Sequence, residues 1–342
     1  MRVGLVCPYD LSKPGGVQAQ VRGLAGHLER AGDDVTIIAP GLPDDVHGVD
    51  LGPTISVPGN RSKVPLAIDP RLARDIRAGA GDLDLLHVHE PLMPVVSLSA
   101  LRAGPPVVGT FHAAPGTFGI GFYTVLRSQL RRILGPNVRQ LTAVSSTAAA
   151  PLPDQLEVSI VPNGIDVAAF ESYVDRHPLR VCFLGRDERR KGLDVLMQAW
   201  EMVARAVPNA ELLVMGADRG SDGITWAGRV DDAEKVRGLA SSAIYVAPHI
   251  GGESFGVVVV EGMAAGCAVV ASELGSFQDV GGDAIHYFPT RDSAALGAAL
   301  ISLLDDPSAV ARLAFAGRSR ASRFDWALVA AEYRAVYQKA LS

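Results

Sequence analysis

Cysteine, an excess of basic charge and long uninterrupted apolar runs are all scarce in this chain of 342 residues. The three cysteines, Cys7, Cys182 and Cys267, lie far apart, and each falls in or beside an expected buried strand. We therefore expect reduced core thiols, and neither a disulfide framework nor a metal site. The longest stretch without Asp, Glu, Lys or Arg, residues 103–126, holds five glycines and three prolines, which excludes a membrane-spanning helix. The first apolar run is too short for a signal peptide, so we expect a cytoplasmic protein.

Neither sign of charge dominates, since 32 basic and 37 acidic residues give a formal net charge of −5. Dedicated nucleic-acid binders are normally basic, so we expect no nucleic-acid partner. The charge is unevenly distributed: residues 1–150 carry 14 basic and 12 acidic residues, whereas residues 151–342 carry 18 and 25. No acidic residue lies between Pro91 and Pro153, where five arginines occur. The N-terminal half is therefore the part expected to face an anion or an anionic membrane surface.

Short β-branched runs alternate with helical patterns along the whole chain, which predicts parallel sheets built from βαβ units. The expected strands are 3–7, 34–39, 83–88, 107–111, 140–144, 158–161, 180–184, 211–215, 243–247 and 268–271. A first helix is expected after the turn that follows strand 3–7. The clearest later helices are 192–206, 256–265 and 326–341. Two open α/β sheets in one chain usually bind ligand in the cleft between them, at the carboxyl ends of their strands.

A Pro14-Gly15-Gly16 turn follows the first expected strand and opens a helix. Glycine lets a backbone approach a ligand closely, and a helix N-terminus offers free N–H groups to a phosphate. The turn lacks the G-x-G-x-x-G spacing of nicotinamide dinucleotide sites. A phosphate-facing turn and a plain tight turn both remain open.

The segment 186–192 is rich in charge and directly follows the expected strand 180–184. Arg186 is expected at the carboxyl end of that strand and Lys191 at the start of the next helix, so the two cations converge. Such a pair suits a diphosphate leaving group, whose charge grows as a glycosidic bond breaks. The alternative for this segment alone is a solvated charged turn.

The strongest motif joins a glycine-rich loop, 251–256, to Glu261 across an apolar run. Backbone N–H groups of the loop suit phosphate or sugar oxygens, Glu253 suits sugar hydroxyls, and Glu261 suits a ribose diol. An unpaired carboxylate is costly to bury in an apolar run, which favours a ligand role for Glu261. The alternative is a helix-capping glutamate followed by a surface glutamate.

These motifs together resemble the retaining glycosyltransferases of family 4, which have the GT-B fold. Glu253 and Glu261 match the E-x7-E element, and Arg186 and Lys191 match the Arg…Lys pair. Within that family the segments CPYD, PGGVQ, HVHEP, FH, VDD and APHIGGESFG are similar to the actinobacterial enzymes that transfer mannose to phosphatidyl-myo-inositol. The resemblance implies an α/β chain of two Rossmann-like domains whose parallel sheets face each other across a deep cleft. It places an acceptor and membrane-side domain at 1–170 and a nucleotide-sugar donor domain at 171–325, with 326–342 packing back on the first.

The resemblance also implies the substrates and the site residues. GDP-mannose is the implied donor and the inositol ring of phosphatidylinositol the acceptor, with no tightly bound cofactor and no required divalent metal. The implied catalytic residues are His112, Arg186, Lys191 and Glu253. The implied donor-binding residues are Gly15, Gly16, Arg186, Lys191, Val230, Lys235, Glu253, Ser254, Phe255, Gly256, Val257 and Glu261. The implied acceptor-binding residues are Tyr9, Gln18, Asn60, Ser62 and His112.

Retention at the anomeric carbon has two explanations. Double displacement needs a carboxylate nucleophile, for which Glu253 is the only candidate, although the resemblance gives it a hydroxyl-binding role. We therefore favour front-face attack, in which the departing phosphate takes the acceptor's proton. His87 and His89 share one face of an expected strand at a spacing that a metal uses, but no third ligand is evident. His249 is interpreted as structural.

A lipid acceptor requires contact with a membrane. One expected amphipathic helix carries the apolar residues Phe122, Leu126, Leu130 and Ile133, flanked by Arg127, Arg131 and Arg132. A second basic face carries Arg71, Arg74 and Arg77. The implied membrane contacts are Arg71, Arg74, Arg77, Arg127 and Arg131, on the inner face of the plasma membrane. The alternative for the first helix is a core-packed helix with solvated arginines.

Two other functions remain open on the sequence. The nearest is a family-4 transferase with another nucleotide-sugar donor or a soluble acceptor, such as an inositol phosphate or a glycan. The alternative from a different class is a non-catalytic, membrane-associated protein that binds a nucleotide sugar. The base of the donor, the acceptor hydroxyl and the oligomeric state are not fixed by the sequence.

Overall fold

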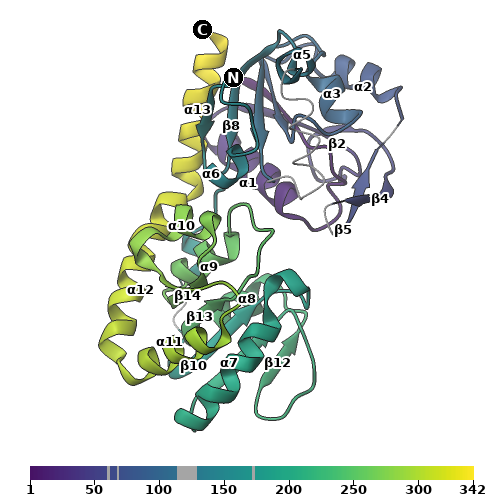
Figure 1. The fold of residues 1–342 in the computed structure, drawn as a ribbon. Coiled ribbons are helices and arrows are strands. Elements are labelled where there is room, and N and C mark those ends of the chain that lie inside the picture. The colour runs from purple at the N-terminus through teal and green to yellow at the C-terminus, as the bar shows by residue number, and fades with distance from the viewer. Residues whose placement is uncertain (60–61, 68, 114–128, 172–173) are drawn as a thin grey trace. The chain divides into compact units, whose positions relative to one another are not determined.

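The computed structural model describes residues 1–59, 62–67, 69–113, 129–171 and 174–342, with the backbone alone described at 56–59, 62–65 and 131. The chain divides into two compact units (Figure 1). Unit 1 comprises Met1–Gly164 and Trp326–Ser342, and unit 2 comprises Ile165–Asp325. The division therefore falls after Gly164 instead of after residue 170. Ile165 explains this difference, because its N–H donates to the Phe324 carbonyl and its backbone pairs with Asp325, both in unit 2.

Unit 1 is built on a seven-stranded parallel sheet with the order β3-β2-β1-β6-β7-β8-β9 in the described residues. This order is that of a doubly wound, Rossmann-like sheet. Its strands are β1 (Arg2–Val6), β2 (Asp34–Ala39), β3 (Gly48–Asp50), β6 (Leu85–His89), β7 (Val107–Phe111), β8 (Val138–Ala143) and β9 (Val158–Ile160). Its helices are α1 (Gly16–Arg30), α2 (Leu72–Gly79), α3 (Val96–Ala100), α5 (Leu130–Leu134), α6 (Ser146–Ala149) and α13 (Trp326–Leu341). A separate antiparallel hairpin consists of β4 (Ile55–Gly59) and β5 (Ser62–Leu66).

The C-terminal helix α13 belongs to the core of unit 1. Its apolar face, which includes Trp326, Val329 and Tyr337, shares a buried cluster with Leu5 of β1 and Leu24 of α1. Alpha-helical spacing accounts for this, because residues three to four apart fall on one face. Gly23 of α1 allows the close approach, since a Cβ there would overlap the Trp326 ring.

Unit 2 is built on a six-stranded parallel sheet with the order β12-β11-β10-β13-β14-β15 in the described residues. Its strands are β10 (His177–Leu184), β11 (Glu211–Met215), β12 (Thr225–Gly228), β13 (Ser242–Ala247), β14 (Ala268–Ser272) and β15 (His286–Phe288). Its α-helices are α7 (Leu193–Ala206), α8 (Asp232–Ala240), α9 (Val257–Ala264), α10 (Gly275–Gly281), α11 (Ser293–Asp305) and α12 (Pro307–Ala321). Short 3-10 turns lie at Ala168–Phe170, Arg189–Lys191, Gly282–Ala284 and Ser322–Phe324. Residues such as Phe183 and Leu196 form the core, where β-branched strands meet the apolar faces of α7 and α11.

The expected elements agree with the structure in most places. The strands 34–39, 107–111 and 211–215 and the helix 326–341 have the expected bounds. Strand β10 begins earlier than expected, at His177. The sequence patterns did not predict β3 or the hairpin. Pro58 and Pro65 hid the hairpin, because they interrupt its strands and prolines usually argue against a strand.

The cysteines and the apolar helices are accounted for within this fold. All three cysteines are buried and free, as expected for core thiols. No single helix of the described residues is long and apolar enough to cross a membrane. One pair of helices, Ser293–Asp305 and Pro307–Phe324, meets the length and composition criteria only together and is bent by 103°.

Candidate functional site

Two loops with charged residues, 186–192 and 248–256, follow the carboxyl ends of the neighbouring parallel strands β10 and β13. The two loops meet there, because the Ile250 N–H donates to the Arg190 carbonyl at 2.9 Å. Gly192 makes the approach close: its φ is +70°, and a Cβ there would overlap the Pro248 carbonyl oxygen. A side chain at this position would therefore push the loops apart. Parallel-strand geometry and one glycine thus hold 186–192 against 248–256.

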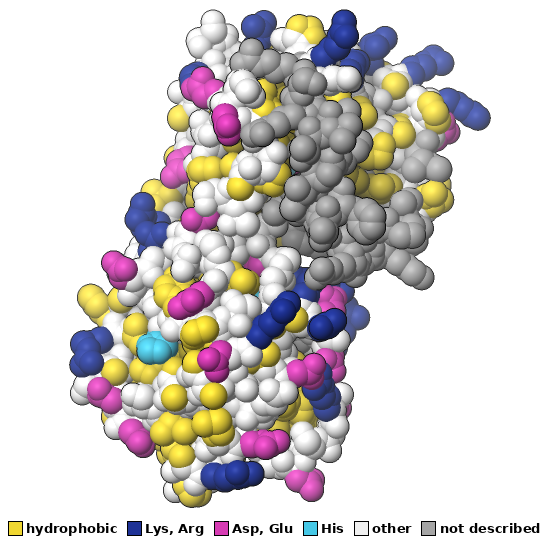
Figure 2. Space-filling view, in the orientation of Figure 1, with side chains coloured by type: hydrophobic (Ala, Val, Ile, Leu, Met, Phe, Trp, Pro, Cys, Tyr) yellow, Lys and Arg dark blue, Asp and Glu magenta, His cyan; other side chains and the backbone are white. Residues whose placement is uncertain are grey.

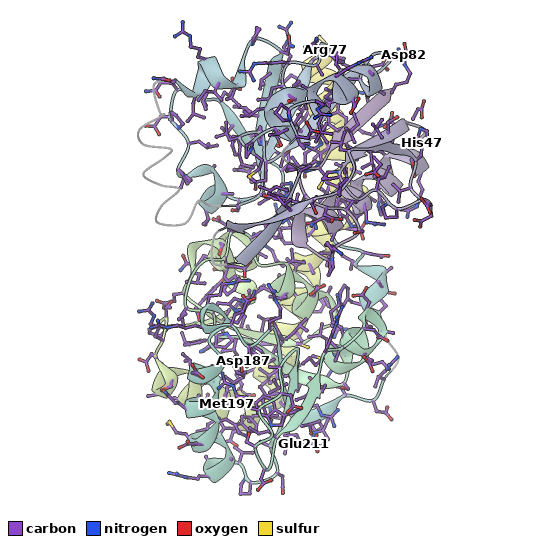
Figure 3. All side chains as sticks on the ribbon, turned by 90° about the vertical axis from the view of Figure 1, so that its right-hand side faces the viewer. His47, Arg77, Asp82, Asp187, Met197 and Glu211 are labelled. Carbon is purple, nitrogen blue, oxygen red and sulfur yellow. The ribbon has the colours of Figure 1, made fainter. Side chains whose placement is uncertain are left out.

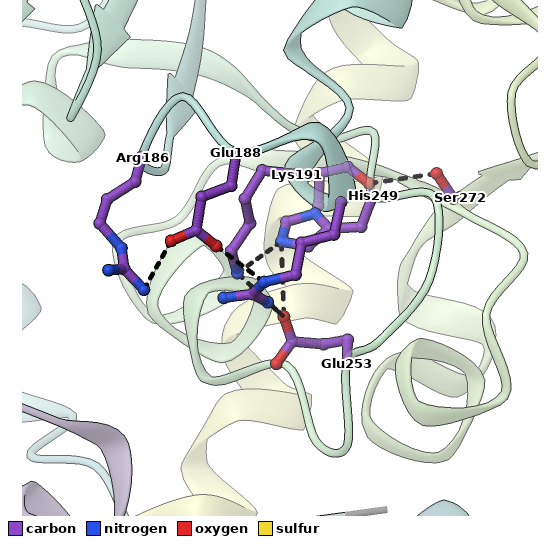
Figure 4. A network of polar contacts seen from close by, with 8 residues as sticks. Arg186, Glu188, Lys191, His249, Glu253 and Ser272 are labelled. Atoms are coloured by element: carbon purple, nitrogen blue, oxygen red, sulfur yellow. Dashed lines mark hydrogen bonds and ion pairs between the residues drawn. The ribbon is translucent and has the colours of Figure 1, made fainter. Parts of the chain in front are cut away.

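Lys191 and Glu253 form the central contact of this site (Figure 4). The Lys191 ammonium donates to Oε2 of Glu253 at 3.0 Å and also contacts Nε2 of His249 at 2.9 Å. Burial lowers the pKa of Lys191, and the negative charge of Glu253 partly offsets that effect. Burial also lowers the pKa of His249 well below its usual range, so this ring is neutral and accepts from Lys191.

Arg186 joins this cluster through intermediates. Its guanidinium lies 2.8 Å from Glu188, which also binds Arg190 at 2.8 Å. Arg190 in turn lies 3.7 Å from Oε2 of Glu253. The Arg186 side chain is 71% exposed, so it remains accessible to an anion. The structure therefore links Arg186 to Lys191 through Glu188, Arg190 and Glu253.

Glu261 is buried and paired. It lies on α9, where Lys235 of α8 donates to its Oε1 at 2.9 Å, and the same ammonium lies 3.0 Å from Asp232. Burial raises the pKa of Glu261, and the Lys235 charge partly opposes this. Burial acts to lower the pKa of Lys235, but Glu261 and Asp232 together outweigh burial and the net shift is upward. The Lys235 ammonium also lies 5.8 Å from the centre of the Phe170 ring.

The remaining donor residues expected in unit 2 lie around these two ion pairs. Gly256 caps α9 with a φ of +97°, and a Cβ there would lie 2.7 Å from Phe277, so glycine is required for this turn. Phe255 is buried and packs edge-to-face on Phe324, with ring centroids 5.7 Å apart. Ser254 and Val257 flank this turn and are partly buried, as is Val230, which precedes the α8 N-cap.

In unit 1, His112 directly follows β7 and is held on two sides. Its backbone N–H donates to Oε1 of Glu90 at 2.9 Å, and the Ala113 N–H donates to the same oxygen at 2.8 Å. Its ring Nε2 lies 2.8 Å from Nδ1 of His89. Burial lowers the pKa of His112 to about 4 and raises the pKa of Glu90 to about 7.

Two of the expected acceptor residues, Tyr9 and Gln18, lie after β1 and near the start of α1. Tyr9 pairs through its backbone with Leu66, the last residue of β5, which places the hairpin beside it. Gln18 is buried, and its amide donates to the Asp10 carbonyl at 3.3 Å. Ser62 begins β5, whereas Asn60 lies outside the described residues.

The glycines of the first turn are exposed and start α1. Gly15 is the N-cap in an extended conformation, and Gly16 is the first helical residue. A Cβ on Gly15 would overlap the Gln18 side-chain amide, whereas one on Gly16 would meet nothing within 4 Å. The open space at Gly16 is what a ligand approaching the helix N-terminus requires.

The histidine pair on β6 has protein partners. His87 Nδ1 lies 2.8 Å from the Tyr337 hydroxyl, and its Nε2 lies 2.6 Å from the Thr110 hydroxyl. Both nitrogens of His87 are therefore already engaged. Among the described residues no group of three or more His, Cys, Asp or Glu side chains is arranged to hold a metal.

Exposed arginines mark one end of unit 1. Arg71, Arg74 and Arg77 are exposed on and beside α2, whose Leu72 and Ile76 are buried. They line a surface hollow of about 570 Å³. Figure 2 shows Lys and Arg side chains gathered at the end of unit 1 where Figure 1 labels α2, and Figure 3 labels Arg77 there.

Only the end of the other expected basic helix is described. It forms α5, in which Leu130 and Leu134 are buried. Arg127 lies outside the described residues, and the side chain of Arg131 is not described. The amphipathic helix around them therefore stays a prediction.

Sequence reasoning missed four members of these clusters. Glu188 and Arg190 were passed over as part of a charged turn, although their place after β10 put them beside Lys191. His249 was interpreted as structural, yet it contacts the Lys191 ammonium. No sequence pattern indicated that Glu90 contacts His112, because this contact depends on the backbone turn at Glu90, where φ is +50°.

Comparisons with known protein families match both units. A model described as "Glycosyltransferase Family 4" matches residues 14–169, and one described as "Glycosyl transferases group 1" matches residues 178–306. The chain is 38% identical to the phosphatidyl-myo-inositol mannosyltransferase of Mycolicibacterium smegmatis, over 99% of this chain and 94% of that protein. It is 36% identical to the protein of the same name from Propionibacterium freudenreichii, over 98% of this chain and 94% of that protein.

Solved structures with the same fold are more distant in sequence. A glycosyltransferase from Rickettsia africae superposes with a TM-score of 0.75 at 16% identity, covering 100% of this chain and 98% of that one. Sucrose-phosphate synthase from Thermosynechococcus elongatus superposes with a TM-score of 0.72 at 18% identity, covering 99% and 98%. The expected α/β arrangement of two parallel sheets and the GT-B fold are therefore confirmed.

Proposed function

The chain belongs to glycosyltransferase family 4, and from this premise we propose that it transfers mannose from GDP-mannose to the inositol ring of phosphatidylinositol, with retention of configuration. The observation that carries the proposal is the partly buried Lys191–Glu253 pair at the carboxyl ends of two parallel strands. A cation and a carboxylate held together there suit a diphosphate and a sugar hydroxyl. The relatives at 36–38% identity supply the choice of mannose and phosphatidylinositol.

The donor is assigned to unit 2. Arg186 and Lys191 bind the diphosphate, and Glu253 accepts hydrogen bonds from the mannose hydroxyls. Glu261 accepts from the ribose diol, while Val230 and Lys235 line the base. The backbone of Ser254, Phe255, Gly256 and Val257 completes the unit 2 part of the donor assignment. Gly15 and Gly16 are assigned to the donor on the resemblance alone. Fixed cations stabilise the leaving group more as its charge grows, which lowers the barrier to bond cleavage.

The transfer step follows from these roles. The bond between the mannose C1 and the diphosphate oxygen breaks, and a bond forms between C1 and an inositol oxygen on the same face. The departing phosphate takes the proton of the attacking hydroxyl. We assign stabilisation of the leaving group's charge to Arg186 and Lys191, and propose no tightly bound cofactor and no divalent metal. Lys191 and His249 already surround Glu253, so its carboxylate is held for hydrogen bonding. A mannosyl adduct recovered on Glu253 would replace this mechanism with double displacement.

The acceptor is assigned to unit 1. Tyr9, Gln18, Asn60 and Ser62 contact the inositol headgroup, and His112 contacts the reacting sugar. The cluster that holds His112 supports this assignment. The ring contacts His89 and the backbone N–H donates to Glu90, so the ring keeps one orientation during a reaction.

A lipid acceptor requires a peripheral position on the inner face of the plasma membrane. The exposed face of Arg71, Arg74 and Arg77 supports this, since each cation near an anionic surface contributes about 1 kcal/mol. Arg127 and Arg131 are assigned to the same surface on the sequence alone.

The proposal is tested by incubating the full chain with GDP-mannose and phosphatidylinositol vesicles and analysing the lipid fraction by mass spectrometry. The expected product is a phosphatidylinositol carrying one hexose. UDP-glucose in place of GDP-mannose tests the donor, and inositol phosphate in place of the lipid tests the acceptor. If a product forms only with UDP-glucose or only with inositol phosphate, the chain is a family-4 transferase with a different donor or acceptor. Binding of GDP-mannose with no product in any arm supports a non-catalytic binding protein.

A further inference from the structure

We infer that His89 is a positioning residue that holds His112 in the tautomer whose proton lies on Nδ1. The inference rests on the proposed role of His112 in mannosyl transfer. The inference goes beyond that role because it specifies the tautomer of the His112 ring at the site.

The contact that carries this inference lies between two neighbouring strands. His89 ends β6, and His112 follows β7, which pairs with β6 in parallel. The Nδ1 of His89 lies 2.8 Å from the Nε2 of His112, and the ring planes are inclined by 28° with centroids 5.0 Å apart. On its other side the His89 ring packs against His87, at 4.2 Å between centroids. His89 is 1% exposed and His112 is 8% exposed, so both rings are held by their surroundings.

The hydrogen bond joins two neutral rings. Burial lowers the pKa of His112 to about 4 and the pKa of His87 to about 3, and it lowers the pKa of His89 well below its usual range. Each ring therefore carries one proton at neutral pH, and the bond between His89 and His112 uses one of them. One ring must donate and the other must accept.

The surroundings of His89 decide which ring donates. If His112 donated from Nε2, His89 would accept at Nδ1 and carry its own proton on Nε2. That Nε2 is buried and has no hydrogen-bond partner among the residues that the structure describes. A buried N–H without an acceptor is rare and costs free energy. A buried ring nitrogen that carries no proton and has no donor costs less. His89 therefore donates from Nδ1, and His112 accepts at Nε2 and keeps its proton on Nδ1.

Asn163 provides a second observation that agrees with this arrangement. Its Oδ1 is buried and makes no hydrogen bond within the described part of the chain. Its side chain opposes the effect of burial on the pKa of His112, which is how a nearby acceptor acts on an imidazole. Because Nε2 of His112 faces His89, an Asn163 acceptor pairs with a proton on Nδ1. His112 then presents a donor, and not a lone pair, on the edge away from His89.

The rest of the cluster fixes the two rings that form this bond. The charged or titratable groups that face it are His87, whose two nitrogens contact Tyr337 and Thr110, and Glu90. Glu90 accepts from the backbone N–H of His112 and so holds the ring's attachment point. Glu90 does not contact the ring nitrogens, so the tautomer depends on His89.

The direct test is a nuclear magnetic resonance spectrum of the full chain labelled with 15N-histidine, recorded at pH 7. The His112 signals are assigned by their loss in a His112→Gln variant. The expected spectrum shows the His112 proton on Nδ1 and a bare Nε2. A proton on Nε2 of His112 overturns the inference. This spectrum needs no substrate, so its outcome is separate from whether the chain transfers mannose.

Two variants of His89 test the consequence for activity. In His89→Asn the side-chain amide places an N–H where Nδ1–H lies, whereas His89→Leu fills the space without a donor. We expect the leucine variant to lose about 10- to 100-fold in kcat with little change in KM, the usual effect of removing a group that orients a site residue. The asparagine variant should stay within about threefold of wild type by the same reasoning. Equal loss in both variants, or full activity in the leucine variant, overturns the inference.

Discussion

The ammonium of Lys191 lies 3.0 Å from the carboxylate of Glu253, although 62 positions of sequence separate the two residues. The two loops that carry them are joined by the Ile250–Arg190 backbone hydrogen bond and by the tight approach of Gly192. The cation is therefore already placed and largely desolvated before any anion arrives. Electrostatic groups that need no rearrangement at the moment of reaction contribute most to stabilising a transition state.

The Lys235–Glu261 pair predicts a difference in stability between two variants. Both Glu261 and Asp232 contact the Lys235 ammonium, but the Glu261 side chain is 12% exposed and the Asp232 side chain 98% exposed. Glu261→Gln leaves a partly buried cation without its main counter-charge, so unfolding should become easier by about 1–3 kcal/mol. Asp232→Asn removes an exposed pair and should change stability by less than about 0.5 kcal/mol.

Urea unfolding of both variants and of wild type measures this difference. Equal midpoints for the two variants would show that burial of Glu261 has no energetic consequence. The Glu261→Gln variant should also bind GDP-mannose more weakly than Asp232→Asn, by about tenfold, because it lacks an ionised acceptor for the ribose.

The buried histidines of unit 1 predict a loss of stability in mild acid. Their folded-state pKa values lie below the usual 6.5, so the unfolded chain binds more protons than the folded chain once the pH falls below 6.5. The stabilisation is therefore complete above pH 6.5 and is lost as the pH falls toward 4. Glu90 acts in the opposite direction, because its raised pKa of about 7 keeps it protonated in the folded state. Because three histidines outweigh one carboxyl, the free energy of unfolding should fall by up to about 3 kcal/mol per pH unit as the pH is lowered.

Unfolding free energies measured between pH 7 and pH 5 check this prediction. His249 of unit 2 adds in the same direction, since burial also lowers its pKa. Glu90→Gln keeps an acceptor for the two backbone N–H groups but removes the opposing titration, so it should steepen the pH dependence. A free energy that stays constant or rises toward pH 5 would contradict the placement of the histidines.

The arginine face of α2 predicts membrane binding that depends on salt. Replacing Arg71, Arg74 and Arg77 with glutamine should weaken binding to phosphatidylinositol-containing vesicles by at least about tenfold at low salt. A matched control replaces three exposed arginines of unit 2, Arg205, Arg229 and Arg237, which should change binding by less than about threefold.

Vesicle co-sedimentation at increasing salt measures both sets. Wild-type binding should weaken as salt screens the arginines. Equal loss in the two triple variants would show that only the overall charge matters and that α2 is not the contact.

Much of the fold was predictable because its strands are buried on both faces and its helices are amphipathic. The strands 34–39 and 107–111 hold β-branched residues that are mostly or wholly buried, and α13 keeps a helical period from Trp326 to Tyr337. The hairpin β4–β5 was not, because its prolines and polar residues hide its pairing.

The site was predictable as a set of residues but not as a set of contacts. Sequence spacing put Glu253 and Glu261 around a helix start, but it did not show that Lys235 neutralises Glu261. It put His89 and His112 at the ends of expected strands, and the neighbouring order of β6 and β7 is what joins their rings. Strand order is a property of the whole sheet, so no local pattern contains it.

The most direct measurement compares lipid mannosylation by wild type, Lys191→Ala and Arg189→Ala under the same conditions, with GDP-mannose and phosphatidylinositol vesicles. Arg189 is the exposed neighbour in the same turn and serves as the matched control. We predict mannosylated phosphatidylinositol from wild type and Arg189→Ala at similar rates, and a rate lower by about 10²–10³ from Lys191→Ala, the usual cost of removing one group that stabilises developing charge. Mannosylated lipid from Lys191→Ala at the wild-type rate, or none from wild type, would contradict the account.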